Sequence, residues 1–198
     1  MMRAIDLAYA NDSVAGFCQS NGVPVVCGYV YNPHISNGSP WHPAGWSADY
    51  LQGLINAGLR YVPIVTMRPS TGEIPSASAV VAAIRSMPRN TDLVGVDVET
   101  GSDPGRDEIL KFTGGVRAEG FRTIVYGHGD TLAAGYADGS YKWGAAYLDD
   151  GWNDARDPAS KGWDAWQYAG DVSPGGFGVD LSTWSIPLMA RKLWWFGG

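Results

Sequence analysis

Short apolar segments alternate along the chain with stretches of mixed polarity that have the length of helices. Eight of the apolar segments have the length and composition of β-strands. They span residues 3–9, 23–31, 60–66, 93–99, 122–126, 143–148, 163–168 and 178–181. The second is nearly all apolar, as expected for a strand that is covered on both faces of a parallel sheet. This alternation predicts an α/β fold.

Helix signals stand between these strands. Residues 47–58 are predicted to form a helix that begins after Ser47 and ends at Gly58, because serine is a good N-cap and glycine a good C-terminal stop. Further helices are predicted at 76–86 and 106–119, with shorter ones near Asn11 or Asp12 and near Asp130. The last third of the chain has few helix signals and many Gly and Asp residues.

Strands interleaved with helices in this way predict a single domain, residues 1–198, folded as a closed parallel (β/α)8 barrel of the TIM type. Such a barrel usually needs about 250 residues, so we expect this one to be shortened or irregular in its last third. An open doubly wound sheet is the alternative. Against it, the first strand runs into Asp6-Leu7-Ala8-Tyr9 and not into a Gly-rich phosphate loop.

Composition narrows the range of functions. The formal net charge of −6 argues against nucleic acid binding and against a polybasic membrane contact. No apolar run reaches the roughly 18 residues that cross a bilayer, and no apolar signal segment opens the chain, so we expect neither membrane insertion nor a signal peptide. The two cysteines, Cys18 and Cys27, are too few for a disulfide scaffold and are predicted to be core residues.

Acidic residues interrupt three of the apolar strands. Asp6 lies in the first, Asp97 and Glu99 end the fourth, and Asp180 lies in the last. Asp97 and Glu99 are two residues apart, so they point to the same side of their strand with Cα atoms about 6–7 Å apart. The first and last strands of a closed barrel are neighbours, and active sites lie at the C-terminal ends of barrel strands. We therefore expect four acids around one pocket.

Crowded carboxyl groups cannot all ionise freely, so at least one pKa is expected to be raised. A carboxylic acid that keeps its proton near neutral pH can protonate the leaving oxygen of a glycosidic bond, while ionised neighbours stabilise the positive transition state. The four acids therefore predict a glycosidase site.

Other roles for these acids are open. A single Asp in a strand can cap a loop or pair with an arginine, and several carboxylates together could hold Mg²⁺ or Ca²⁺. The histidines, His34, His42 and His128, lack the spacing of metal ligands. We expect no metal and no other cofactor.

The same residues carry a resemblance to a known family. The segment Gly95-Val96-Asp97-Val98-Glu99 resembles the Asp-x-Glu strand of the family 25 glycoside hydrolases, the Chalaropsis-type muramidases. The start Ala4-Ile5-Asp6-Leu7 resembles their opening strand, and Trp166-Gln167-Tyr168 followed by Val179-Asp180-Leu181-Ser182 resembles their closing motifs. Residues 28–32 and 54–65 are more similar to a sister group, the glycoside-hydrolase-like barrels of actinobacteria and their phages, formerly a domain of unknown function.

This resemblance implies roles for the individual residues. Glu99 would be the general acid, and Asp97 would orient the substrate's acetamido group or stabilise the transition state. Asp6 and Asp180 would be supporting acids on the floor of the cleft. The implied reaction is cleavage of peptidoglycan between N-acetylmuramic acid and N-acetylglucosamine at the bacterial cell wall. The expected lack of a signal peptide fits a phage-encoded protein that is released from the host cytoplasm through a membrane pore or carried in a virion.

Four aromatic residues at strand ends could stack on sugar rings or hydrogen-bond to them, namely Tyr31, Tyr126, Tyr147 and Trp166. Core packing is the alternative for each.

A function without turnover is also compatible with the sequence. The barrel could bind the wall or serve as a structural module, for example in a phage tail. The apolar C-terminal segment Trp194-Trp195-Phe196 predicts a contact with a partner chain or virion, or else closure of the bottom of the barrel.

Overall fold

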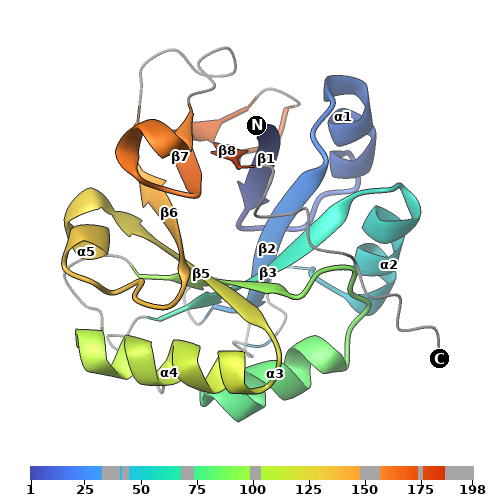
Figure 1. Ribbon diagram of the computed structural model, residues 1–198. Coiled ribbons are helices and arrows are strands. Elements are labelled where there is room, and N and C mark those ends of the chain that lie inside the picture. Colours follow the sequence, from blue (N-terminus) through green and yellow to red (C-terminus); the bar gives the residue numbers. More distant parts are fainter. Residues whose placement is uncertain are drawn as a thin grey trace.

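The computed structural model describes residues 1–32, 41, 45–67, 74–98, 104–147, 157–173 and 176–185. Its strands close into one barrel in chain order, as Figure 1 shows. They are β1 (Met2–Leu7), β2 (Val25–Tyr31), β3 (Arg60–Thr66), β4 (Leu93–Asp97), β5 (Arg122–His128), β6 (Tyr141–Ala145), β7 (Ala165–Val172) and β8 (Val179–Trp184). The predicted closed eight-stranded barrel is confirmed, and the alternative of an open sheet is wrong.

The last strand departs from the parallel arrangement. Strands β1 to β7 run parallel to one another, whereas β8 is antiparallel to both of its neighbours, β1 and β7. The prediction of an all-parallel barrel is therefore wrong for β8, while the predicted irregularity of the last third is confirmed. The segment between β7 and β8, residues 173–178, is too short for the crossover of about a dozen residues that a parallel pair needs.

Helices cover the outside of the barrel. They are α1 (Val14–Asn21), α2 (Ala48–Asn56), α3 (Ala77–Arg85), α4 (Arg106–Ala118), the short α5 (Gly129–Ala133) and a 3-10 helix, η3 (Pro158–Lys161). Ser47 caps α2 as predicted, because its Oγ accepts a hydrogen bond from the backbone N–H of Tyr50 at 3.2 Å. None of the helices in the described ranges is both long and apolar enough to span a bilayer.

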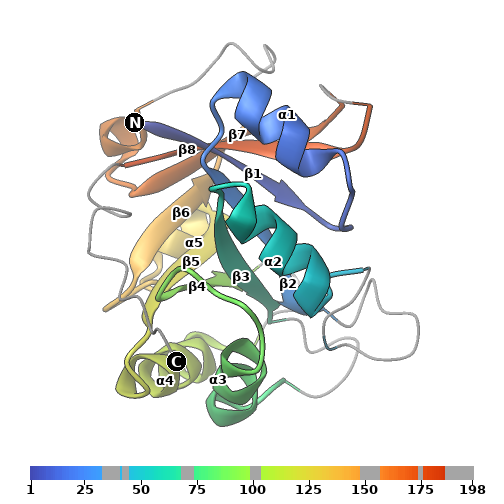
Figure 2. The same ribbon diagram turned by 90° about the vertical axis from the view of Figure 1, so that its right-hand side faces the viewer.

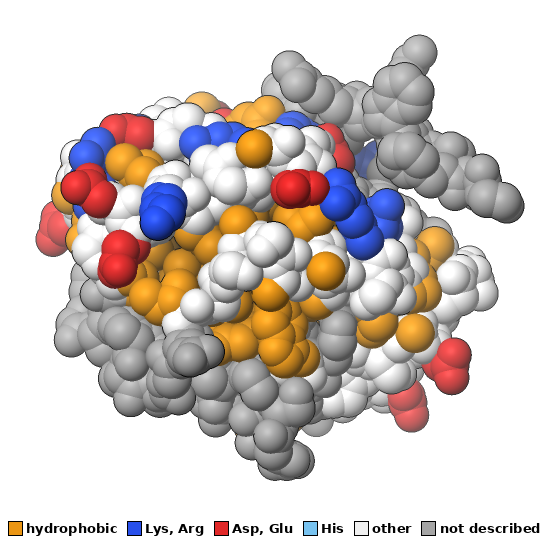
Figure 3. Space-filling view, turned by 90° about the horizontal axis from the view of Figure 1, so that it is seen from below, with side chains coloured by type: hydrophobic (Ala, Val, Ile, Leu, Met, Phe, Trp, Pro, Cys, Tyr) orange, Lys and Arg blue, Asp and Glu red, His pale blue; other side chains and the backbone are white. Residues whose placement is uncertain are grey.

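Helices α3 and α4 lie side by side against one side of the barrel, as Figures 1 and 2 show. They approach closely at Gly115, where an added Cβ would lie 2.7 Å from the Cβ of Ala77. Hydrophobic side chains gather on the face that is seen from below (Figure 3). Small residues such as Ala79 and Ala82 are exposed on α3.

Side chains alternate between the inside and the outside of the barrel. On β2, Cys27 packs in the interior cluster, whereas Val26 packs against the surrounding helices. Gly28 also faces outward, and an added Cβ there would lie 2.2 Å from the ring of Trp46. Cys18 and Cys27 are free and buried, which confirms their prediction as core residues.

Two tryptophans fill the half of the interior that is farther from the C-terminal ends of β1 to β7. Trp143 and Trp184 meet edge to face with centroids 5.2 Å apart, and the Trp143 indole donates to the hydroxyl of Ser182. Apolar residues occupy most of this half, whereas the acidic residues of the interior lie toward the other end.

Candidate active site

Three of the four predicted acids meet at one end of the barrel. Asp6 and Asp97 point inward near the C-terminal ends of β1 and β4. Asp180 lies near the N-terminal end of β8, and because β8 is antiparallel, its register pairs Asp180 directly with Asp6. The reversed strand thus brings Asp180 to the mouth. Glu99 lies outside the described residues.

An amide side chain joins two of these acids. The Nε2 of Gln167, on β7, donates to Oδ2 of Asp6 at 3.2 Å and to Oδ2 of Asp180 at 3.0 Å. Gln167 is only 2% exposed; its contact with Asp6 is buried, and its contact with Asp180 is partly buried. The role of Gln167 was not predicted from the sequence, although an amide among the apolar residues of a strand is the same kind of signal as the acids.

Asp180 has a second donor at the edge of the barrel. The backbone N–H of Asp171 donates to Oδ1 of Asp180 at 2.6 Å. Asp171 has a φ of 53°, a left-handed conformation that is uncommon outside glycine, and it lies where the β7–β8 pairing shifts register. The irregular backbone therefore turns an N–H group toward the carboxylate.

Asp97 is 4% exposed and is held by residues of the two preceding strands. Tyr29 on β2 and Thr66 on β3 donate long hydrogen bonds to its Oδ2, at 3.5 Å and 3.4 Å. Sequence reasoning missed both, because inward-facing hydroxyls in apolar strands have no motif of their own.

Burial raises the pKa of Asp6 well above its usual value, and the nearby Asp180 and Asp97 carboxylates raise it further. Burial also raises the pKa of Asp180, although the Asp171 N–H and other hydrogen bonds oppose this. Asp180 has more donors than Asp6, so its ionised form is better stabilised. We therefore expect the proton that the pair shares to lie mainly on Asp6.

Two of the predicted aromatic residues border this cluster. The hydroxyls of Tyr126 and Tyr147 both donate to Oε1 of Gln167, that of Tyr147 at 3.1 Å. Tyr147 is 56% exposed and Tyr126 is half-buried. Tyr9, which follows β1, is also largely exposed and was not singled out from the sequence.

The other two aromatic residues lie elsewhere. Tyr31 belongs to the core cluster shared with α3 and α4 and meets the ring of Trp41 at 4.9 Å. Trp166 precedes Gln167 and belongs to the outer core on the α1 and α2 side, where its indole donates to the carbonyl of Ala146. Both side chains are buried.

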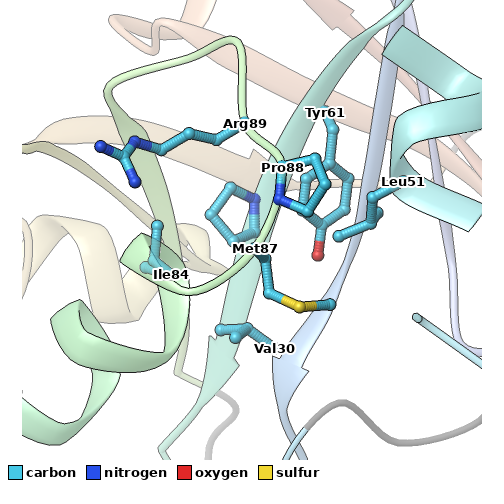
Figure 4. A pocket seen from close by; sticks show the side chains of 8 residues that line it. Val30, Leu51, Tyr61, Ile84, Met87, Pro88 and Arg89 are labelled. Atoms are coloured by element: carbon cyan, nitrogen blue, oxygen red, sulfur yellow. The ribbon is translucent and has the colours of Figure 1, made fainter. Parts of the chain in front are cut away.

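The described residues contain no group of three or more His, Cys, Asp and Glu side chains arranged to hold an ion. A small apolar pocket lies away from the acids, on the outside of the barrel between α2 and α3 (Figure 4). Leu51, Tyr61 and Met87 are among its lining residues. Its volume of about 10 Å³ holds at most one water molecule, so it is a packing gap and not a substrate site.

By sequence, neither a family model nor a curated protein matches this chain. By structure, the chain is similar to the catalytic domain of the endolysin ply40 from bacteriophage P40 of Listeria monocytogenes. The TM-score is 0.70 and the identity 17%, over 96% of this chain and 95% of that one.

Two further solved structures are also similar. A bacterial lysozyme from Streptomyces coelicolor gives a TM-score of 0.66 at 18% identity, over 94% of each chain. A family 25 glycosyl hydrolase from Bacillus anthracis gives 0.65 at 12% identity, over 93% of this chain and 88% of that one. The chain therefore has the barrel fold of the family 25 lysozymes and endolysins, with three acids gathered at its mouth.

Proposed function

We propose that this protein is a glycoside hydrolase of the lysozyme type that cleaves the glycan strand of bacterial peptidoglycan. The observation that carries the proposal is the convergence of Asp6, Asp97 and Asp180 at one mouth of the barrel. The lysozyme and endolysin names of proteins with the same fold support the same reading.

The proposed reaction is general acid catalysis between N-acetylmuramic acid and N-acetylglucosamine. Glu99, two residues beyond Asp97 in the chain, is the proposed acid that protonates the leaving oxygen. Asp97 then orients the substrate's acetamido group or stabilises the positive charge that develops on the sugar ring. Asp180, ionised on the floor of the mouth, adds to that stabilisation.

Exposed aromatic rings offer surfaces for the sugar chain. Tyr147 and Tyr9 follow β6 and β1 respectively, so both stand on the mouth side of the barrel. Their half-exposed rings have the flat apolar face that packs on a pyranose ring, with a hydroxyl at the edge for a hydrogen bond. We propose that they line the groove, with Tyr126 completing the inner wall.

The proposed place of action is the bacterial cell wall. An endolysin from a Listeria phage has the same fold, and we propose that this chain too is phage-encoded and close to the actinobacterial and phage barrels. The C-terminal segment with Trp194, Trp195 and Phe196 lies outside the described residues, and its contact with a partner chain or virion remains part of this proposal.

Purified protein incubated with isolated actinobacterial cell walls tests the function. We expect wild type to release reducing ends, whose masses identify the bond cleaved. Glu99→Gln should lower the rate by about 100-fold or more, because it removes the proton donor. Glu108→Gln, the same change at an exposed position in the first turn of α4, should match wild type.

A different result would assign the other function. If no variant releases reducing ends, yet all sediment with the walls, the chain is a wall-binding module without turnover. If Glu99→Gln keeps the full rate, the proposed acid is wrong.

A further inference from the structure

The amide of Gln167 uses its full hydrogen-bonding capacity within the site. Its nitrogen donates to one oxygen of Asp6 and one of Asp180, and its oxygen accepts from the hydroxyls of Tyr126 and Tyr147. A glutamine amide has two N–H donors and two lone pairs on oxygen, so every position is occupied.

The partners also determine which way the amide faces. If the amide were turned over, its oxygen would face the ionised Asp180 carboxylate, which has no proton to donate, and the hydrogen bond to that group would be lost. The tyrosine hydroxyls can instead donate to the amide oxygen in the observed orientation. Tyr126 from β5 and Tyr147 after β6 therefore direct the N–H groups toward β1 and β8.

We infer that Gln167 is a positioning residue of the site, whose amide holds the Asp6 and Asp180 carboxyl groups side by side while two tyrosine hydroxyls fix its direction. This role rests on the proposed function, because it matters for catalysis only if the acids take part in hydrolysis. It goes beyond that function in assigning the geometry of the acid pair to a neutral residue.

The amide also influences the charge of the pair. Each of its N–H groups favours the ionised form of one carboxyl group, which opposes burial and mutual repulsion. The other titratable groups that face the pair are Asp97 on β4, Cys27 on β2, Tyr126 on β5, Tyr147 after β6 and Asp171 on β7. Because Gln167 is neutral, its removal changes hydrogen bonding without changing the formal charge of this set.

A pH titration of the Asp6 and Asp180 carboxyl carbons by NMR tests the inference directly. Asp6→Asn and Asp180→Asn assign the two signals. In Gln167→Met, which keeps the side-chain length but has no N–H, we expect the apparent pKa values of the pair to rise by about one pH unit. Gln52→Met makes the same change on the exposed face of α2 and should titrate as wild type does.

Tyr147→Phe provides a second route if Gln167→Met does not fold. Because Tyr147 is largely exposed, its hydroxyl can be removed without emptying the core. We expect a smaller rise in the same direction, since the amide keeps one of its two anchors. Unchanged titration curves in the variants that fold would overturn the positioning role.

Activity separates this inference from the proposed function. The proposed reaction needs a negative carboxylate at the mouth, so the acid limb of the kcat/KM profile should move to higher pH in Gln167→Met, in step with the NMR titration. If the titration shifts while wild type cleaves no cell wall, the positioning holds and the hydrolase proposal fails. If wild type cleaves walls while the titration stays unchanged, the hydrolase proposal holds and the positioning fails.

Discussion

At the scale of single residues, each of the three acids gathered at the mouth is held by a polar side chain from another strand. Asp6, Asp97 and Asp180 stand out because a charged group interrupts an apolar strand. The roles of Gln167, Tyr29 and Thr66 come from their contacts with residues on other strands. Their contacts join strands far apart in the chain, so no local pattern encodes them.

Glycines show how the same substitution has opposite effects at two positions. Gly28→Ala should destabilise the protein by about 1–3 kcal/mol, because the new methyl group would clash with the Trp46 ring. Gly53→Ala, in the middle of α2 with open space around it, should instead stabilise by about 0.5–1 kcal/mol. Urea denaturation of the two variants checks both signs. If the two substitutions changed the free energy of unfolding equally, the Trp46 ring would not restrict the space at Gly28.

At the scale of elements, sequence patterns located strands and helices well but not the direction of the last strand. The helix predicted at 106–119 corresponds to α4 (Arg106–Ala118), and the one at 76–86 to α3 (Ala77–Arg85). Local signals such as caps and glycine stops determine these ends. The direction of β8 depends on the length of the connection before it. The predicted strands at 163–168 and 178–181 leave nine residues between them, which is already fewer than the dozen or so of a parallel crossover.

Two serine caps allow a matched test of helix termini. Ser47 caps α2 through a side-chain hydrogen bond to the Tyr50 N–H, whereas Ser13 stands at the start of α1 without one. We expect Ser47→Ala to lower the free energy of unfolding by about 1 kcal/mol, and Ser13→Ala to change it by less than about half of that. Thermal or urea unfolding measures both. A larger loss at Ser13 would contradict the assigned difference in capping.

At the scale of the whole molecule, closure of the barrel brings the acids of the site together. Asp6 and Asp180 are separated by most of the chain, yet they are paired across the β1–β8 junction. Closure of the barrel alone led us to predict from the sequence that these two residues are close. The two side chains lie at the same end of the barrel because β8 is antiparallel to β1. Closure also confines two carboxyl groups to a buried space, which affects stability.

The buried acid pair should make the protein less stable as the pH rises. The pKa of Asp6 is raised in the folded state, so between the ordinary carboxyl pKa near 4 and the raised value the folded chain binds more protons than the unfolded chain. The free energy of unfolding therefore falls with increasing pH across this window and levels off above the raised pKa. Urea midpoints measured from about pH 4 to pH 8 should show this decline in wild type.

Asp6→Asn, which cannot ionise, should flatten this decline, whereas Asp12→Asn at an exposed position should leave it in place. If the stability of Asp6→Asn declines as steeply as that of wild type, the proton is not held on Asp6. The expected charge distribution, with Asp6 protonated and Asp180 ionised, is then wrong.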